Sequence, residues 1–126
     1  MSTAIHHAMS SAKKHGGEPE EYLHIHEWFD QYKAHGWNFA HRMILHHTGG
    51  IELCEQVFGP MLEISTGKQI PIRWIGEQHM REDFGFVPTP GDWMEAILGT
   101  KDGQPPGPRS WMLRGAKTAE QLGVAQ

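Results

Sequence analysis

Two histidine–aspartate pairs with the same spacing are the clearest candidates for chemistry in this sequence. His26 and Asp30 stand four residues apart in "HEWFD", and His79 and Asp83 stand four residues apart in "HMRED". Side chains four residues apart share one face of an α-helix, so each pair presents an imidazole beside a carboxylate. Zinc, manganese and iron all accept this combination of ligands. The repeated spacing therefore predicts two parts of one metal site.

A third ligand is expected in the stretch "HRMILHHTGGIELCE", residues 41–55. On a helix, apolar residues such as Ile44 and Ile51 enclose His47, which predicts that His47 points into the core and that His46 lies at its edge. An inward imidazole between two His–Asp pairs gives a mixed nitrogen and oxygen site for a divalent transition metal such as zinc, manganese or iron. The expected metal ligands are His26, Asp30, His47, His79 and Asp83.

An ordinary structural role for the same residues stays open. Each His–Asp pair can be a hydrogen bond on a helix surface, and His47 can be a core histidine that the protein itself satisfies. None of the histidines forms an H-E-x-x-H motif. Burying a polar group without a partner costs on the order of a few kcal/mol, so the three features taken together favour a metal.

Four further residues are candidates for catalysis at such a metal. A bound metal lowers the pKa of its water ligand, and Glu77 or His46 is expected to transfer protons. Arg42 or Arg73 is expected to hold an anionic group of the substrate, although either arginine can instead pair with a nearby glutamate. The predicted function is that of a metal-dependent hydrolase acting on a phosphoester or nucleotide.

Glycines and prolines divide the chain into the elements that must position these residues. The pattern predicts a mainly α fold, a small helical domain of about five helices with one two-stranded β-hairpin. The helices are expected at about 3–15, 19–35, 38–58, 76–84 and 90–98. Two β-prone runs, 61–65 and 69–75, flank a Thr-Gly turn and predict the hairpin at about 61–75. Residues 1–99 are expected to form the domain, and 100–126 a Pro/Gly-rich linker and partly flexible tail.

Composition narrows the classes of partner. The chain has ten histidines and one cysteine, so a metal would bind to nitrogen and oxygen. The formal net charge is −4, which argues against a nucleic-acid partner. No apolar run approaches the roughly 20 residues of a membrane span, so we expect no membrane partner and a cytoplasmic location. A small-molecule or nucleotide substrate and a host protein both remain possible partners, and the oligomeric state is open.

Three segments carry histidine motifs that occur together: "HHAMSSAKKHGGEPEEYLHIHEWFD", "HRMILHHTGGIELCEQVFG" and "IPIRWIGEQHMREDFGFVPTPGDW". With them, residues 5–95 resemble an uncharacterised family of small histidine-rich proteins from bacteriophages, prophages and bacterial genomes. The chain has Met43-Ile44-Leu45 where that family often has an Ala-Leu-Arg type segment. The resemblance implies a bacterial host cell and a second class of function, a non-enzymatic host-takeover or anti-defence protein that binds a host factor. The matching residues are His6, His7, Ile25, His26, Trp28, Phe29, Asp30, His41, Arg42, His46, His47, Gly50, Glu77, Gln78, His79 and Asp83.

Overall fold

The computed structural model describes residues 3–33 and 42–114 and confirms the predicted fold class. The described residues form six α-helices, one antiparallel β-hairpin and a short 3-10 helix. None of these helices has both the length and the apolar character needed to cross a membrane. The elements are α1 (Ala4–His15), α2 (Glu20–Phe29), α3 (Arg42–Leu45), α4 (Thr48–Phe58), β1 (Met61–Glu63), β2 (Gln69–Pro71), α5 (Ile72–Phe84), α6 (Pro90–Leu98) and η2 (Ser110–Leu113).

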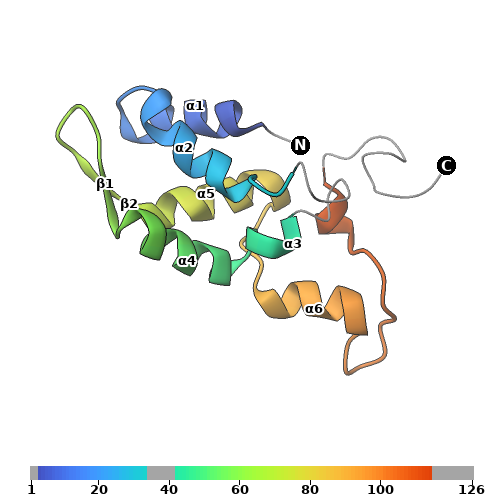
Figure 1. The fold of residues 1–126 in the computed structure, drawn as a ribbon. Helices are drawn as coiled ribbons and strands as arrows, with labels where there is room; N and C mark the ends of the chain where they lie inside the picture. Colours follow the sequence, from blue (N-terminus) through green and yellow to red (C-terminus); the bar gives the residue numbers. More distant parts are fainter. Residues whose placement is uncertain (1–2, 34–41, 115–126) are drawn as a thin grey trace.

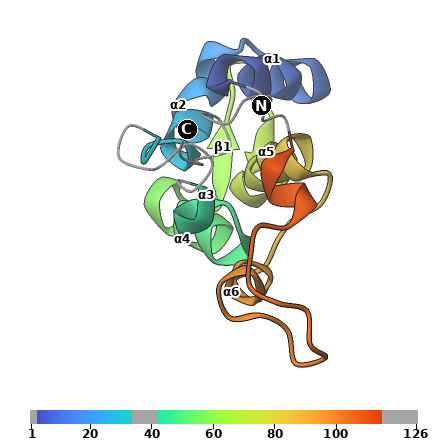
Figure 2. The same ribbon diagram turned by 90° about the vertical axis from the view of Figure 1, so that its right-hand side faces the viewer.

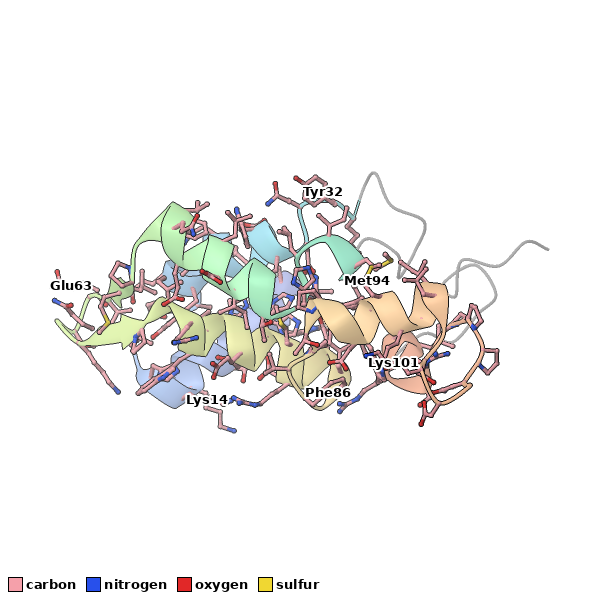
Figure 3. All side chains as sticks on the ribbon, turned by 90° about the horizontal axis from the view of Figure 1, so that it is seen from below. Lys14, Tyr32, Glu63, Phe86, Met94 and Lys101 are labelled. Atoms are coloured by element: carbon pink, nitrogen blue, oxygen red, sulfur yellow. The ribbon has the colours of Figure 1, made fainter. Side chains whose placement is uncertain are left out.

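Helix α5 is the central element of the fold. It contacts α1, α2 and α4, and α1 also packs along α2 (Figure 1). Figure 2 shows the same helices end-on, with α1 and α2 on one side of the bundle and α4 with α6 on the other. The hairpin projects from one end, where Glu63 lies, and Lys101 lies toward the opposite end (Figure 3). Residues on the inward face of α5 therefore meet side chains from three other helices.

The hydrophobic core follows the inward faces of these helices. Its largest members include Tyr22 and Phe29 from α2 and Met80 from α5, each 0% exposed. Gly76 allows α5 to come close, because a Cβ atom there would lie 3.0 Å from Phe29 Cζ and 3.1 Å from Ile51 Cγ1. Close packing of this kind holds polar side chains on the same helix faces at fixed positions.

Two of the predicted helices begin and end where their caps indicate. Helix α1 follows Thr3 and stops at Gly16, whose φ of 93° suits glycine. Helix α6 begins with a capping box, in which the Thr89 hydroxyl accepts from Asp92 N–H and the Asp92 carboxylate accepts from Thr89 N–H. Local signals in the sequence were sufficient for both elements.

The predicted third helix is wrong in one important respect, because it is two helices. α3 ends at Leu45, and α4 begins at Thr48 with His47 as its N-cap. The close approach of α3 and α4 requires Gly50, since a Cβ atom at that position would overlap the carbonyl oxygen of Leu45. The expected start at Asn38 lies outside the described residues. The helix break turns His46 rather than His47 toward the core.

We expect Gly50→Ala to destabilise the protein by about 3 kcal/mol or more, at the upper end of overpacking effects, because the new methyl group collides with backbone. Gly91→Ala is the control, since a Cβ atom there lies 3.5 Å from Thr89 Oγ1, an ordinary contact. Urea unfolding followed by circular dichroism measures both. Equal midpoints for Gly50→Ala and wild type would show that α3 and α4 do not meet in this way.

The hairpin is shorter than predicted and α5 is longer. β1 and β2 pair in antiparallel register, with Leu62 opposite Ile70. Pro71 cannot donate a hydrogen bond to continue the ladder, and the chain turns directly into α5 at Ile72. Residues 72–75, predicted as strand, are therefore helical, which places Arg73 on α5 rather than on the hairpin.

Part of the segment after residue 99, which was expected to be a linker and tail, packs on the helical body. Met112 in η2 is 2% exposed and belongs to the core. The Trp111 ring packs against Phe84 and Trp93 with centroid distances of 5.3 and 4.7 Å. Residues 110–113 thus pack on the helical body, while residues 115–126 of the predicted tail lie outside the described residues.

Candidate metal centre

A cluster of buried histidines and aspartates lies where α2 and α5 meet the turn between α3 and α4. Helix α5 supplies His79 and Asp83, which lie one helical turn apart. Asp30 caps the C-terminus of α2, and His46 lies in the turn after α3. The side chains of His46 and His79 are 0% exposed, that of Asp83 is 2% exposed and that of Asp30 is 15% exposed. Elements far apart in sequence thus place four potential ligands together.

The atoms of these four side chains form a compact group, with all ligand atoms within 4.8 Å of one another. His46 Nε2 lies 3.1 Å from His79 Nε2. Asp30 Oδ1 is 3.2 Å from His46 Nε2 and 3.4 Å from His79 Nε2. Asp83 Oδ2 is 3.4 Å from each of the same two nitrogens. Five of the six distances within the group are therefore between 3.1 and 3.4 Å.

These spacings match a tetrahedral metal site. Zinc binds imidazole nitrogen at about 2.0–2.1 Å and carboxylate oxygen at similar distances, and the edges of such a tetrahedron are about 3.3–3.4 Å. We name Asp30, His46, His79 and Asp83 the four-ligand group. Two nitrogens and two oxygens also suit manganese and iron. The chemistry and the spacing of the donor atoms both fit a divalent transition metal.

The ionisation of the group favours a cation at its centre. Burial raises the pKa of both aspartates, but hydrogen bonds from His46 outweigh burial and lower the pKa of Asp30 and of Asp83 below the ordinary value. Burial also lowers the pKa of His79 to about 4, so its ring is neutral at pH 7. Arg42 and His7 lie beside Asp83 Oδ1 and compensate part of the negative charge of the two carboxylates. A divalent metal between Asp30 and Asp83 would compensate the rest.

The turn that presents His46 is held from several directions. The backbone N–H of His46 donates to Arg42 O at 2.8 Å, and the backbone carbonyl of His46 accepts from Trp93 Nε1 at 2.9 Å. The next helix is tied to the same region, because Thr48 N–H donates to Pro88 O at 2.9 Å. Helix α6 and its preceding loop therefore fix the position of one ligand without contributing a ligand themselves.

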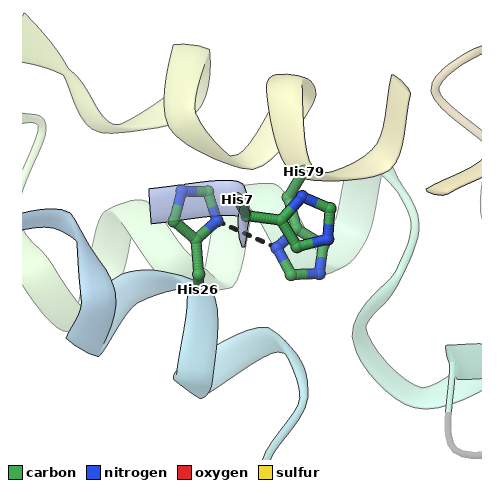
Figure 4. Close-up of side chains that lie close together, drawn as sticks. All are labelled: His7, His26 and His79. Atoms are coloured by element: carbon green, nitrogen blue, oxygen red, sulfur yellow. Dashed lines mark hydrogen bonds between the residues drawn. The ribbon is translucent and has the colours of Figure 1, made fainter. Parts of the chain in front are cut away.

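Two more buried histidines, His7 of α1 and His26 of α2, lie against His79 (Figure 4). The three rings form a second group with ligand atoms within 4.8 Å. Their nitrogens already have partners, however: His26 Nδ1 meets His79 Nδ1 at 2.9 Å, and His26 Nε2 meets Ser11 Oγ at 2.8 Å. This group also lacks a carboxylate, and both nitrogens of His26 meet side-chain partners, so it suits a divalent metal less well than the four-ligand group.

His7 connects the centre to a surface carboxylate. Its Nε2 lies 3.2 Å from Asp83 Oδ1, and its Nδ1 lies 2.7 Å from Glu82 Oε1. Burial lowers the pKa of His7, but the hydrogen bonds and charges of Asp83 and Glu82 outweigh burial and raise it above the ordinary value. His7 thus holds the oxygen of Asp83 that does not belong to the four-ligand group. His7 is not one of the five residues expected to bind the metal, because a histidine near the start of α1 has no carboxylate at helical spacing.

Arg42, one of the expected catalytic residues, is buried beside the centre. It is 1% exposed, its Nη2 lies 3.9 Å from Asp83 Oδ1, and its guanidinium carbon lies 4.9 Å from the centre of the Phe84 ring. Nη1 donates to Met112 O at 3.4 Å, whereas within the described residues Nε and Nη2 have no hydrogen-bond acceptor. The buried guanidinium therefore places a positive charge beside Asp83, next to the four-ligand group.

The structure does not place His47 at the centre, which corrects the expectation that it points inward. As the N-cap of α4, it accepts a hydrogen bond at Nδ1 from Gly50 N–H at 3.2 Å. Its Nε2 lies 3.1 Å from Ile44 O, to which it donates. With both nitrogens bonded to local backbone, His47 has no nitrogen directed at the cluster. The helical spacing argument assumed one continuous helix and therefore selected the wrong member of the His46–His47 pair.

Glu77 and Arg73 also lie away from the centre, on the outer face of α5. Arg73 Nε lies 3.8 Å from Glu77 Oε2, and Arg81 Nη1 lies 3.6 Å from Glu77 Oε1. The side chains of Arg73 and Arg81 are 58% and 61% exposed. These three residues form a surface row at four-residue spacing, so the geometry does not support the expected catalytic roles of Glu77 and Arg73. The alternative that the arginine pairs with a glutamate agrees with this arrangement.

Comparison with known proteins gives a family for most of this chain. The model of the family described as "Domain of unknown function (DUF6915)" matches residues 2–102, which include every residue of the four-ligand group. No curated protein and no solved structure matches the chain. The match extends over more than half of the sequence. The chain therefore belongs to the DUF6915 family of domains of unknown function.

Proposed function

We propose that this protein binds one divalent transition metal, such as zinc, manganese or iron, through Asp30, His46, His79 and Asp83. The observation that carries the proposal is the set of five distances of 3.1–3.4 Å between donor atoms from three separate parts of the chain. A network of hydrogen bonds alone does not require these atoms to lie at nearly equal separations. A metal ion with tetrahedral ligands does.

We further propose that this centre carries out metal-assisted hydrolysis of a phosphoester or nucleotide. A metal lowers the pKa of a water ligand and stabilises negative charge on phosphoryl oxygens. Asp30 is the most exposed of the four ligands, so it is the ligand that a water molecule would replace most easily. The positive charge of Arg42 beside Asp83 supports an anionic substrate, because a guanidinium binds phosphate with two parallel hydrogen bonds once phosphate reaches it.

A binding protein is the second candidate, and the surface of α6 supports it. Met94, Ile97 and Leu98 are 47%, 47% and 70% exposed, which leaves apolar area on one side of this helix. Exposed apolar patches are frequent at sites of protein–protein contact. In this case the metal would stabilise the fold, and α6 would meet a host factor. The phage association and anti-defence role implied by the resemblance belong to this second proposal.

Metal analysis of His46→Asn and His47→Asn compares the loss of a proposed ligand with the same substitution at the adjacent residue, which is not a proposed ligand. We expect wild type, purified without a histidine tag, to hold one metal per chain and to show the strong visible bands of tetrahedral cobalt after substitution. His46→Asn should lose both, because a ligand is removed. His47→Asn should keep both, because asparagine is also a good N-cap and His47 has no nitrogen in the group.

Two outcomes would contradict the proposal. Wild-type protein without stoichiometric metal, and without a gain in stability on addition of zinc, manganese or iron, would indicate a purely protein-satisfied cluster. Equal metal content in His46→Asn and wild type would place the metal elsewhere. If the protein binds metal but does not turn over phosphomonoesters, phosphodiesters or nucleoside triphosphates, the proposed metal site would stand and the proposed hydrolysis would be contradicted.

A further inference from the structure

A chain of hydrogen bonds runs behind the four-ligand group and links α1, α2 and α5. Gln78 Oε1 lies 2.8 Å from Ser11 Oγ, and Ser11 Oγ lies 2.8 Å from His26 Nε2. His26 Nδ1 in turn lies 2.9 Å from His79 Nδ1 (Figure 4). Ser11, His26 and His79 are 0% exposed and Gln78 is 4% exposed. Because bulk water does not reach these groups, the bonds they make with one another decide where each proton lies.

The direction of the chain is determined at Gln78. Its Nε2 donates to His7 O at 3.0 Å and to Glu82 Oε1 at 3.2 Å, both of which accept. The amide oxygen of Gln78 therefore faces Ser11 and can only accept. The single hydroxyl hydrogen of Ser11 faces two groups that can only accept, Gln78 Oε1 at 2.8 Å and His7 O at 3.1 Å. Ser11 Oγ has no second hydrogen for His26 and must accept from it. The proton of His26 is thus on Nε2.

The same logic fixes the proton of His79. The His26 ring is fully buried, and its two nitrogens meet Ser11 Oγ and His79 Nδ1, with no carboxylate at either nitrogen among the described residues. A charged imidazole there would have no counter-ion, so the ring is neutral, and a proton on Nε2 leaves a lone pair on Nδ1. That lone pair accepts from Nδ1–H of His79. A neutral His79 with a proton on Nδ1 has none on Nε2. The unprotonated Nε2 faces His46, Asp30 and Asp83, which is the state that metal binding requires.

We propose that His26 is a positioning residue of the metal centre, which accepts the Nδ1 proton of His79 and so directs the bare Nε2 of His79 at the metal. The inference rests on the metal centre proposed above. Histidine ligands of metals commonly donate their other N–H to a protein acceptor, which fixes the tautomer and the ring orientation. Here a second imidazole, itself oriented by Ser11 and Gln78, supplies the acceptor. His26, expected from its spacing with Asp30 to be a ligand, acts instead through His79.

Zinc affinity and cobalt spectra of His26→Leu and His26→Gln test this role, with His24→Leu as the matched control. Loss of an acceptor behind a metal ligand lowers affinity by about 10- to 100-fold. We expect that loss in His26→Leu, with one metal still bound per chain at saturation and tetrahedral cobalt bands retained. His26→Gln should recover most of the affinity, because its amide oxygen can accept from His79 and its amide nitrogen can donate to Ser11. His24 is exposed on α2, so His24→Leu should bind like wild type.

Each contrary result has a distinct meaning. Loss of the metal or of the tetrahedral bands in His26→Leu would make His26 a ligand and overturn its positioning role. Unchanged affinity in His26→Leu, or equal affinity of His26→Leu and His26→Gln below wild type, would show that the hydrogen bond to His79 does not control the metal. Failure of wild type to bind zinc would overturn the metal centre together with this inference, whereas the other results overturn this inference alone.

Discussion

His79→Ala is expected to abolish metal binding and with it the metal-dependent part of stability. The Nε2 atom of His79, like that of His46, lies within 3.4 Å of a donor atom of each of the other three residues of the four-ligand group. A metal present at about 1,000 times its Kd stabilises the folded state by about 4 kcal/mol. For a domain of this length, that corresponds to a rise in Tm on the order of 15 °C.

The measurement compares Tm with and without added metal, after treatment with a chelator. The Tm of wild type should rise by the full amount on addition of metal, and the Tm of His79→Ala should not rise. The metal-free Tm of His79→Ala also differs from that of wild type, because a buried ring has been removed. His24→Ala is the control on the surface of α2 and should gain as much as wild type. An equal gain in His79→Ala and wild type would show that the metal binds outside the four-ligand group.

Met112→Ala is expected to destabilise the protein by about 2–5 kcal/mol, the usual range for truncating a buried methionine. Met112 is 2% exposed, and its carbonyl oxygen accepts from Arg42 Nη1. The adjacent Trp111 ring packs on Phe84 and Trp93, so η2 covers the end of the helical body next to the candidate centre. A cavity at Met112 removes apolar contacts there and loosens the cover over Arg42.

Urea unfolding followed by tryptophan fluorescence measures this effect. Met94→Ala is the matched control, because Met94 is 47% exposed on α6 and substitutions at such surface positions usually change stability by less than about 0.5 kcal/mol. If Met112→Ala and Met94→Ala had equal midpoints, η2 would not be packed on the body, and the linker and tail expected from the sequence after residue 99 would be the better description.

Local sequence signals predicted much of the fold because caps and turns act over only a few residues. Gly16 ends α1, and the Thr89–Asp92 capping box begins α6, as expected. The hairpin lies at the predicted turn. Such signals fail where two elements meet at one point. Residues 42–58 have the periodicity of one helix, yet the contact of Gly50 with Leu45 divides them. Nothing within a single helical period reveals that contact.

The candidate site shows the same division. Four-residue spacing pointed to His79 and Asp83, which lie on one face of α5, and to Asp30, which caps α2 one turn after His26. The structure assigns His46 to the centre in place of His47, since only the break between α3 and α4 decides which imidazole turns inward. It also separates His26, which hydrogen-bonds to His79, from the four-ligand group.

By itself, then, the sequence determined the helical class and the hairpin and pointed to the residue types of the candidate metal centre, because propensity, capping and helical period are properties of short segments. Only the tertiary structure decided which of these residues meet. The Asp30–His46–His79–Asp83 group joins positions up to 53 residues apart, and its distances depend on how α2 and α5 pack around Gly76 and on the turn that Trp93 holds. Packing across the chain sets such distances, and no short segment contains that information.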